Sequence, residues 1–126
     1  MKQVIKTEKA PGAIGPYSQG IKACNLMFIS GQLPIDVSVS EDLITEPKAA
    51  ARAALNNVKA IVEAGGATMD QVVKVTLFLT DMKDFTAVNE VYAEFFKDPC
   101  PSRSTYAVAG LPKGAVLEIE AIAFTG

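Results

Sequence analysis

The sequence contains no histidine, and its two cysteines, Cys24 and Cys100, lie far apart in the chain. A structural zinc site needs about four clustered nitrogen or sulfur ligands, which these two thiols cannot supply. The sequence also has no GxGxxG motif and no Walker loop, so it gives no support for a nucleotide cofactor. We therefore expect no metal and no cofactor. Any chemistry must use the side chains of Glu, Asp, Arg, Tyr, Ser and Thr, together with the backbone.

Long apolar runs are absent as well. No segment approaches the ~20 apolar residues of a membrane-spanning helix, and residues 1–6 lack the apolar core and cleavage signal of a secreted protein. We therefore expect a cytoplasmic protein with reduced cysteines. The net charge of −2 argues against a dedicated nucleic-acid-binding protein, which would carry a basic face. The 126 residues, 49% of them hydrophobic, are expected to form a single domain, 1–126.

Two segments have the apolar spacing of amphipathic helices. The first is predicted at 45–65, with Thr45 as its N-cap and Gly65-Gly66 at its end. The second is predicted at 84–97. The prolines of Asp98-Pro99-Cys100-Pro101 keep the following residues out of the helical region, so an extended loop is expected there.

Two strands are predicted with clear alternation, at 72–80 and 117–124. Apolar side chains share one face of each strand: Val73, Val75, Leu77 and Leu79 in the first, and Leu117, Ile119, Ala121 and Ala123 in the second. Further strands are expected near 2–6, 19–24, 26–31 and 103–108. The resulting order β-β-β-α-β-α-β-β predicts an α+β fold, a mixed β-sheet with two helices packed on one face.

The second face of this sheet would be left uncovered. Phe78, Ile122 and Phe124 on it are too apolar for water, whereas Lys74 and Glu118 are too polar for an ordinary core. A large exposed apolar patch usually marks association, and closed symmetry is the default for copies of one chain. We therefore expect an oligomer whose polar side chains collect in clefts between subunits.

One arginine and two carboxylates form the candidate site. Pro101-Ser102-Arg103-Ser104-Thr105 is followed closely by Leu117-Glu118-Ile119-Glu120. An arginine matches a carboxylate with its planar fork, and a nearby glutamate can orient or deprotonate a water molecule. The two segments therefore indicate either a pocket for a small carboxylic acid or a plain Arg–Glu ion pair at a sheet edge.

Four segments carry a family resemblance: Gly15-Pro16-Tyr17-Ser18-Gln19, Ser30-Gly31-Gln32, Pro101-Ser102-Arg103-Ser104 and Leu117-Glu118-Ile119-Glu120. They resemble the RidA (YjgF) family of reactive intermediate deaminases, often described as translation-inhibiting endoribonucleases. The resemblance runs from near the N-terminus to about residue 124. It implies a chorismate-mutase-like α+β fold, a homotrimer and active sites between subunits. The implied reaction hydrolyses 2-imino acids, formed from enamines such as 2-aminoacrylate, to 2-oxo acids and ammonia. This protects pyridoxal-phosphate enzymes and needs no cofactor.

The resemblance also implies roles for residues. Arg103 would clamp the substrate carboxylate, with the Thr105 main-chain N–H as a second donor, and Glu118 would position the attacking water. The remaining substrate-binding positions implied are Tyr17, Ser30, Gly31 and Asn89. Many relatives have cysteine where this chain has Thr105, so a role for a thiol at that position is excluded here.

Some alternatives stay open on the sequence alone. Glu120 is either part of the site or paired with Lys74 or Arg52, and Tyr17 is either a pocket wall or packing at a turn. Two other functions also remain. One is an endoribonuclease that inhibits translation, and the other is a non-catalytic trimer that binds carboxylate metabolites.

Overall fold

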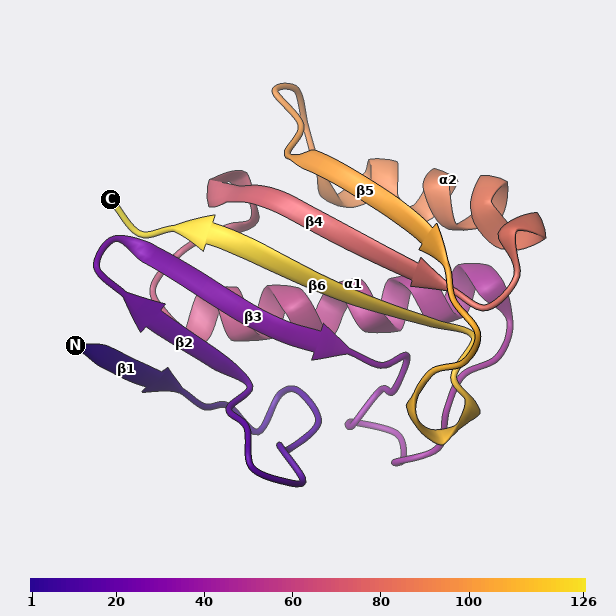
Figure 1. Ribbon diagram of the computed structural model, residues 1–126, viewed down its shortest axis with the longest axis horizontal. Coiled ribbons are helices and arrows are strands. Elements are labelled where there is room, and N and C mark those ends of the chain that lie inside the picture. The colour runs from indigo at the N-terminus through magenta and orange to yellow at the C-terminus, as the bar shows by residue number, and fades with distance from the viewer.

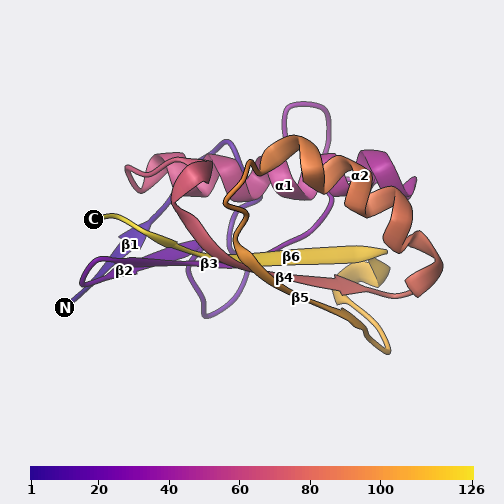
Figure 2. The same cartoon turned by 90° about the horizontal axis from the view of Figure 1, so that it is seen from above.

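The computed structural model describes residues 1–126 and contains one six-stranded mixed sheet (Figure 1). The strands are β1 (Lys2–Ile5), β2 (Gly20–Ala23), β3 (Leu26–Gln32), β4 (Val72–Leu79), β5 (Ser102–Ala107) and β6 (Leu117–Phe124). They lie in the order β1-β2-β3-β6-β4-β5, and only β4 and β5 are parallel neighbours. Figure 2 shows both α-helices on one side of the sheet, so the predicted α+β fold is confirmed.

Helix α1 (Pro47–Ala64) begins with a different cap from the predicted one. The prediction of Thr45 was wrong. The N-cap is Glu46, whose carboxylate accepts hydrogen bonds from the main-chain N–H groups of Lys48 and Ala49 at 2.8 and 3.1 Å. This side chain satisfies two donors that the first helical turn leaves unpaired. The helix ends at Gly65, as predicted.

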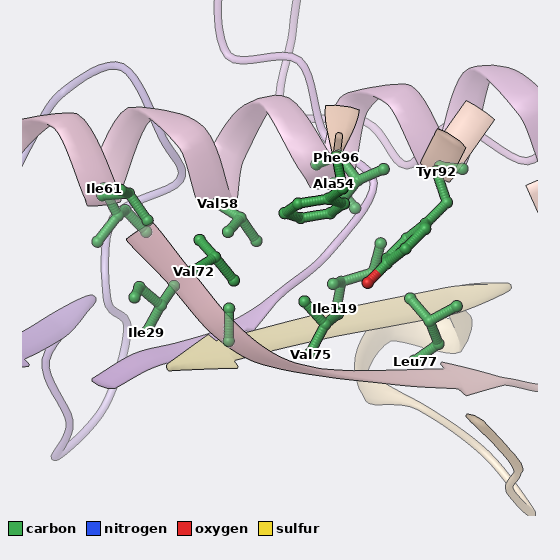
Figure 3. Close-up of a cluster of buried hydrophobic side chains, with 14 of the residues drawn as sticks. Ile29, Ala54, Val58, Ile61, Val72, Val75, Leu77, Tyr92, Phe96 and Ile119 are labelled. Carbon is green, nitrogen blue, oxygen red and sulfur yellow. The ribbon is translucent and has the colours of Figure 1, made fainter. Parts of the chain in front are cut away.

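Helix α2 (Phe85–Phe95) lies within the predicted segment 84–97. Three short 3₁₀ helices were not predicted: η1 (Met69–Gln71), η2 (Met82–Asp84) and η3 (Pro112–Gly114). Neither α-helix combines the length and the apolar character that a membrane crossing requires. Between the helices and the sheet lies the hydrophobic core, in which Figure 3 shows Ala54, Val58 and Ile61 of α1 above Val72, Val75, Leu77 and Ile119 of the sheet.

Strand β4 departs from the predicted alternation at its start. The pairing with β6 shifts between Val72 and Lys74, so Val72 is buried and Val73 is 41% exposed. Val73 was therefore wrongly predicted to share the core face, because a bulge reverses the alternation at that point. From Val75 onward the pattern of β4 is as predicted, and the four predicted apolar residues of β6 are all buried.

The face of the sheet away from the helices is uncovered, as predicted (Figure 2). It carries Phe28, Tyr106 and Phe124, which are 42%, 53% and 41% exposed, together with the half-buried Phe78 and Ile122. The rings of Phe78 and Tyr106 stack with their centroids 6.3 Å apart. We call these five residues the open face. An apolar surface of this kind usually marks a contact with another molecule.

Candidate active site

A bulge in β3 brings Ser30 and Gly31 to the candidate site. Ile29 pairs with Ala121 and Gln32 pairs with Ile119, so β3 holds one residue more than β6 between these pairs. The Ser30 hydroxyl donates a hydrogen bond to the Ser18 carbonyl at 2.6 Å, and the Ser30 N–H donates to the Gln19 carbonyl at 2.9 Å. The bulge is thereby tied to the loop that carries Tyr17.

Gly31 makes room for the carboxylate of Glu118. A Cβ atom added at Gly31 would lie only 2.6 Å from Cδ of Glu118 and 2.9 Å from Oε2. Such separations are far below van der Waals contact, so any side chain at this position would displace the carboxylate. The glycine therefore allows Glu118 to lie against the backbone of β3.

Glu118 lies in the wall of a cleft of about 620 Å³. The predicted residues Tyr17, Ser30 and Gly31 line the same cleft, and so does Glu120. Tyr17 is thus a pocket wall, although more than half of its surface is exposed in the single chain. The structure therefore brings four of the predicted site residues, Tyr17, Ser30, Gly31 and Glu118, together in one cleft.

Gln19 organises the loop beside this cleft and was given no role from the sequence. Its buried side-chain amide donates hydrogen bonds to the carbonyls of Thr7, Ala10 and Pro11, and its oxygen accepts one from the Thr7 N–H. These four hydrogen bonds hold residues 7–11 against Gln19, which follows Tyr17 by two residues. The motif containing Gln19 was visible in the sequence, but its partners are backbone groups, which sequence motifs do not reveal.

Glu118 holds its proton more tightly than an ordinary glutamate does. Burial raises its pKa, and the negative charge of Glu120 raises it further. Both effects disfavour the ionised form. A carboxyl group shifted in this direction is better matched to proton transfer near neutral pH.

Arg103 lies elsewhere, between the edge strand β5 and helix α2. Its Nη1 donates a hydrogen bond to Oδ1 of Asn89 at 2.7 Å, and its guanidinium carbon lies 4.6 Å from the ring centroid of Tyr92 and 5.5 Å from that of Phe85. Asn89, predicted as a substrate contact, therefore touches Arg103 in the single chain. The contacts with Tyr92 and Phe85 were not predicted, because they depend on how α2 is placed over β5.

Within one chain, Arg103 and Glu118 lie on opposite faces of the sheet. Arg103 pairs in register with Val75, whose side chain faces the helices, whereas Glu118 pairs with Phe78 of the open face. Partners in register share a face of the sheet. Thr105, in register with Leu77, is on the helix side with Arg103. The chain therefore contains no Arg103–Glu118 ion pair, and that alternative interpretation is wrong.

The ion pair that the sequence left open as an alternative for Glu120 is also absent. Arg52 binds Glu94 of α2 instead, with Nη2 3.0 Å from the carboxylate, and no ion pair joins Glu120 to Lys74. Glu120 is left exposed in the cleft with Glu118. No group of three or more histidine, cysteine, aspartate or glutamate side chains is arranged to hold a metal ion.

Comparison with known proteins places this geometry in a family. The Endoribonuclease L-PSP family model matches residues 7–125. A 2-iminobutanoate/2-iminopropanoate deaminase of Dermatophagoides farinae is 48% identical over 122 residues, which cover 96% of this chain and 94% of the relative. The chain belongs to the RidA (YjgF) family.

Two solved structures of RidA-family proteins from Escherichia coli have the same fold. The YjgF gene product superposes with a TM-score of 0.92 at 44% identity, covering 98% of this chain and 99% of that one. TdcF with bound serine gives the same TM-score, identity and coverage. The shared RidA fold therefore extends over nearly the whole chain.

Proposed function

We propose that the protein is an enzyme that hydrolyses 2-imino acids to 2-oxo acids and ammonia, at a site shared by two copies of the chain. The position of Glu118 carries this proposal, since its carboxylate has a raised pKa and lies against Gly31 in an open cleft. The relative from Dermatophagoides farinae is named for this activity. The bound serine of TdcF also carries the α-carboxylate that such substrates have.

The opposite placement of Arg103 and Glu118 requires two copies of the chain. Within a single sheet, the two side chains could reach one substrate only if one of the strands turned its faces over. A second copy on the open face can set its own β5 edge against the cleft. We propose that a homotrimer built in this way forms three equivalent sites, because closed rotational symmetry uses every such surface.

In this site, Arg103 would bind the substrate carboxylate through its planar fork. The Thr105 N–H is the second donor. Strand β5 is the sheet edge, and Val108 donates its N–H to the Leu79 carbonyl of β4 at 2.8 Å. Main-chain groups alternate along a strand, so the Thr105 N–H points away from β4 and toward the ligand. Tyr17, Ser30 and Gly31 of the other copy would enclose the substrate.

Hydrolysis then needs only one proton carrier. Water adds to the carbon of the protonated imine while ionised Glu118 accepts a proton from that water, which gives a carbinolamine. Glu118 returns the proton to the nitrogen. The C–N bond breaks and the nitrogen leaves as ammonia. The hydroxyl proton passes to the again ionised Glu118 and from it to the ammonia, so the products are the 2-oxo acid and ammonium. The iminium carbon is already a strong electrophile, so positioning supplies most of the remaining acceleration.

A coupled assay tests this function. A dehydratase that forms 2-aminoacrylate from serine is run with and without the protein, and ammonia release is followed. The protein should accelerate release, Glu118→Gln should lower turnover roughly 10²-fold, and Arg103→Lys should weaken 2-oxo acid binding by about tenfold to a hundredfold. If Glu118→Gln keeps the wild-type turnover, another residue is the general base, and Glu120 is the first candidate.

The two other functions predict different results. A metabolite-binding trimer without activity would bind 2-oxo acids but leave ammonia release unchanged. An endoribonuclease should bind RNA with an affinity that falls steeply with salt. The cleft disfavours this second function, because Glu118 and Glu120 would repel phosphate and the net charge of the chain is −2.

A further inference from the structure

One stripe of helix α2 contacts the guanidinium of Arg103. Phe85, Asn89 and Tyr92 are spaced four and three residues apart, so they share one face of the helix. The two rings lie 5.5 and 4.6 Å from the guanidinium carbon, within the range of cation–π attraction, and Asn89 accepts the hydrogen bond from Nη1. Arg103 is thus held by contacts of two kinds from a single rigid element.

Tyr92 is an unexpected choice for a residue of the core. It is 7% exposed, its ring packs against Phe96 at 4.7 Å, and its hydroxyl is the one buried side-chain polar atom without a hydrogen-bond partner. Burial raises its pKa to about 12, so the ring stays neutral. A buried unpaired hydroxyl is unfavourable, and packing alone would favour phenylalanine. The contact with Arg103 is made by the ring. It gives an aromatic residue at this position a function beyond packing, although it leaves the hydroxyl itself without a role.

The three contacts leave the guanidinium able to bind a ligand. Arginine has five N–H donors, and Asn89 takes one of them. The aromatic rings use none. The remaining donors can still form a bidentate pair with a carboxylate. A long side chain that is already fixed in direction also loses less rotamer freedom when it binds.

We propose that Tyr92, Phe85 and Asn89 are positioning residues. They hold the guanidinium group of Arg103 in its binding orientation before the substrate arrives. We call these three residues the Arg103 seat. This inference rests on the proposed function, in which Arg103 grips the substrate carboxylate. None of the three residues needs to touch the substrate, because each acts through the guanidinium.

The test measures binding of 2-oxobutanoate, a stable carboxylate, by calorimetry. Asn89→Ala and Tyr92→Leu should each weaken binding about tenfold, because a charge-assisted hydrogen bond or a cation–π contact is lost. Tyr92→Phe should recover most of the affinity that Tyr92→Leu loses, since it keeps the ring. Thr86→Ala, an exposed change on the same helix, is the matched control.

A double-mutant cycle separates positioning from a general effect on folding. In an Arg103→Ala background, Asn89→Ala should cause no further loss of binding. Asn89 is exposed, so Asn89→Ala should leave the thermal stability unchanged. The test with this variant therefore stays valid even if Tyr92→Leu fails to fold. Additive losses in the cycle, or wild-type affinity in Asn89→Ala, would overturn the inference.

The outcome also separates this inference from the proposed function. If Arg103→Ala loses binding while folded Asn89→Ala and Tyr92→Leu bind normally, the Arg103 seat is wrong and the proposed clamp stands. If Arg103→Ala binds 2-oxobutanoate like the wild type, the clamp itself is wrong.

Discussion

At the scale of single residues, the position and the acidity of Glu118 depend on two neighbours. Gly31 determines where the carboxylate lies, since no other residue leaves space between β3 and the side chain. Glu120 affects when the carboxylate is charged, since its own negative charge raises the pKa of Glu118. Geometry and protonation can therefore be changed separately, by two different substitutions.

Gly31→Ala should displace Glu118 while leaving the fold intact. The added Cβ meets the flexible end of a side chain rather than backbone, so the thermal midpoint should change little. A misplacement of about 1 Å can lower turnover by up to 10²-fold, and we expect a loss of roughly tenfold to a hundredfold. Steady-state kinetics and thermal melting check the two parts. Wild-type turnover would mean that Glu118 need not lie against β3.

Glu120→Gln should move the acid limb of the pH–rate profile to lower pH. Activity needs ionised Glu118 and is lost as the pH falls through its raised pKa. Removing the charge of Glu120 stabilises the Glu118 carboxylate and so lowers that pKa. Profiles of kcat/KM for the wild type, Glu120→Gln and the exposed control Glu63→Gln test this. If the acid limb of the Glu120→Gln profile lies at the same pH as that of the wild type, another group determines the position of this limb.

At the scale of elements, helix α1 depends on a cap that the sequence did not indicate. Thr45 has the usual capping side chain, yet Glu46 binds the first free N–H groups. Glu46→Ala should lower the free energy of unfolding by about 1 kcal/mol. Thr45→Ala, the matched control one residue earlier, should have little effect. Urea unfolding of both variants measures the difference, and the reverse order would restore Thr45 as the cap.

The same example shows which parts of the fold the sequence could predict. Periodicity located both α-helices, strands β4 and β6 and the buried face of β6, because long amphipathic segments have few alternative packings. The other four strands were expected without a clear alternation, and each was found near its expected range. Periodicity failed for Glu46 and Val73, where one extra residue or one longer side chain changes a local contact. The bulge at Ser30 could not be predicted either, since an extra residue in a ladder leaves no periodic signal.

The candidate site was predictable as a set of residues but not as an arrangement. Family motifs identified Tyr17, Ser30, Gly31 and Glu118, which line one cleft. They also identified Arg103. Its side chain lies on the opposite face of the sheet from Glu118, and this depends on the strand register, since a shift of one residue reverses the face of every side chain in a strand. Contacts made through neighbouring elements, such as the Arg103 seat, follow from packing alone and have no sequence signature.

At the scale of the whole molecule, two features lead to one expectation: the open face, and the placement of Arg103 and Glu118 on opposite faces of the sheet. Aromatic side chains of β3, β5 and β6 remain partly exposed on the face of the sheet that also carries Glu118. Burying them stabilises association by about 25 cal/mol for each Å² of apolar surface removed from water. The same association would bring the Arg103 of one copy to the Glu118 of another. Assembly and activity should therefore be lost together.

Light scattering at micromolar concentration should give a mass about three times the 13.3 kDa of the chain. Phe124→Glu puts a charge on the open face and should shift the protein toward monomers, because an unpaired charge at an interface is strongly unfavourable. Turnover should fall in parallel and recover as protein concentration is raised. Val39→Glu, at an apolar side chain that is 80% exposed outside the open face, should keep both mass and turnover. A stable wild-type monomer with full activity would contradict the shared site, because one chain alone cannot bring Arg103 and Glu118 to the same substrate.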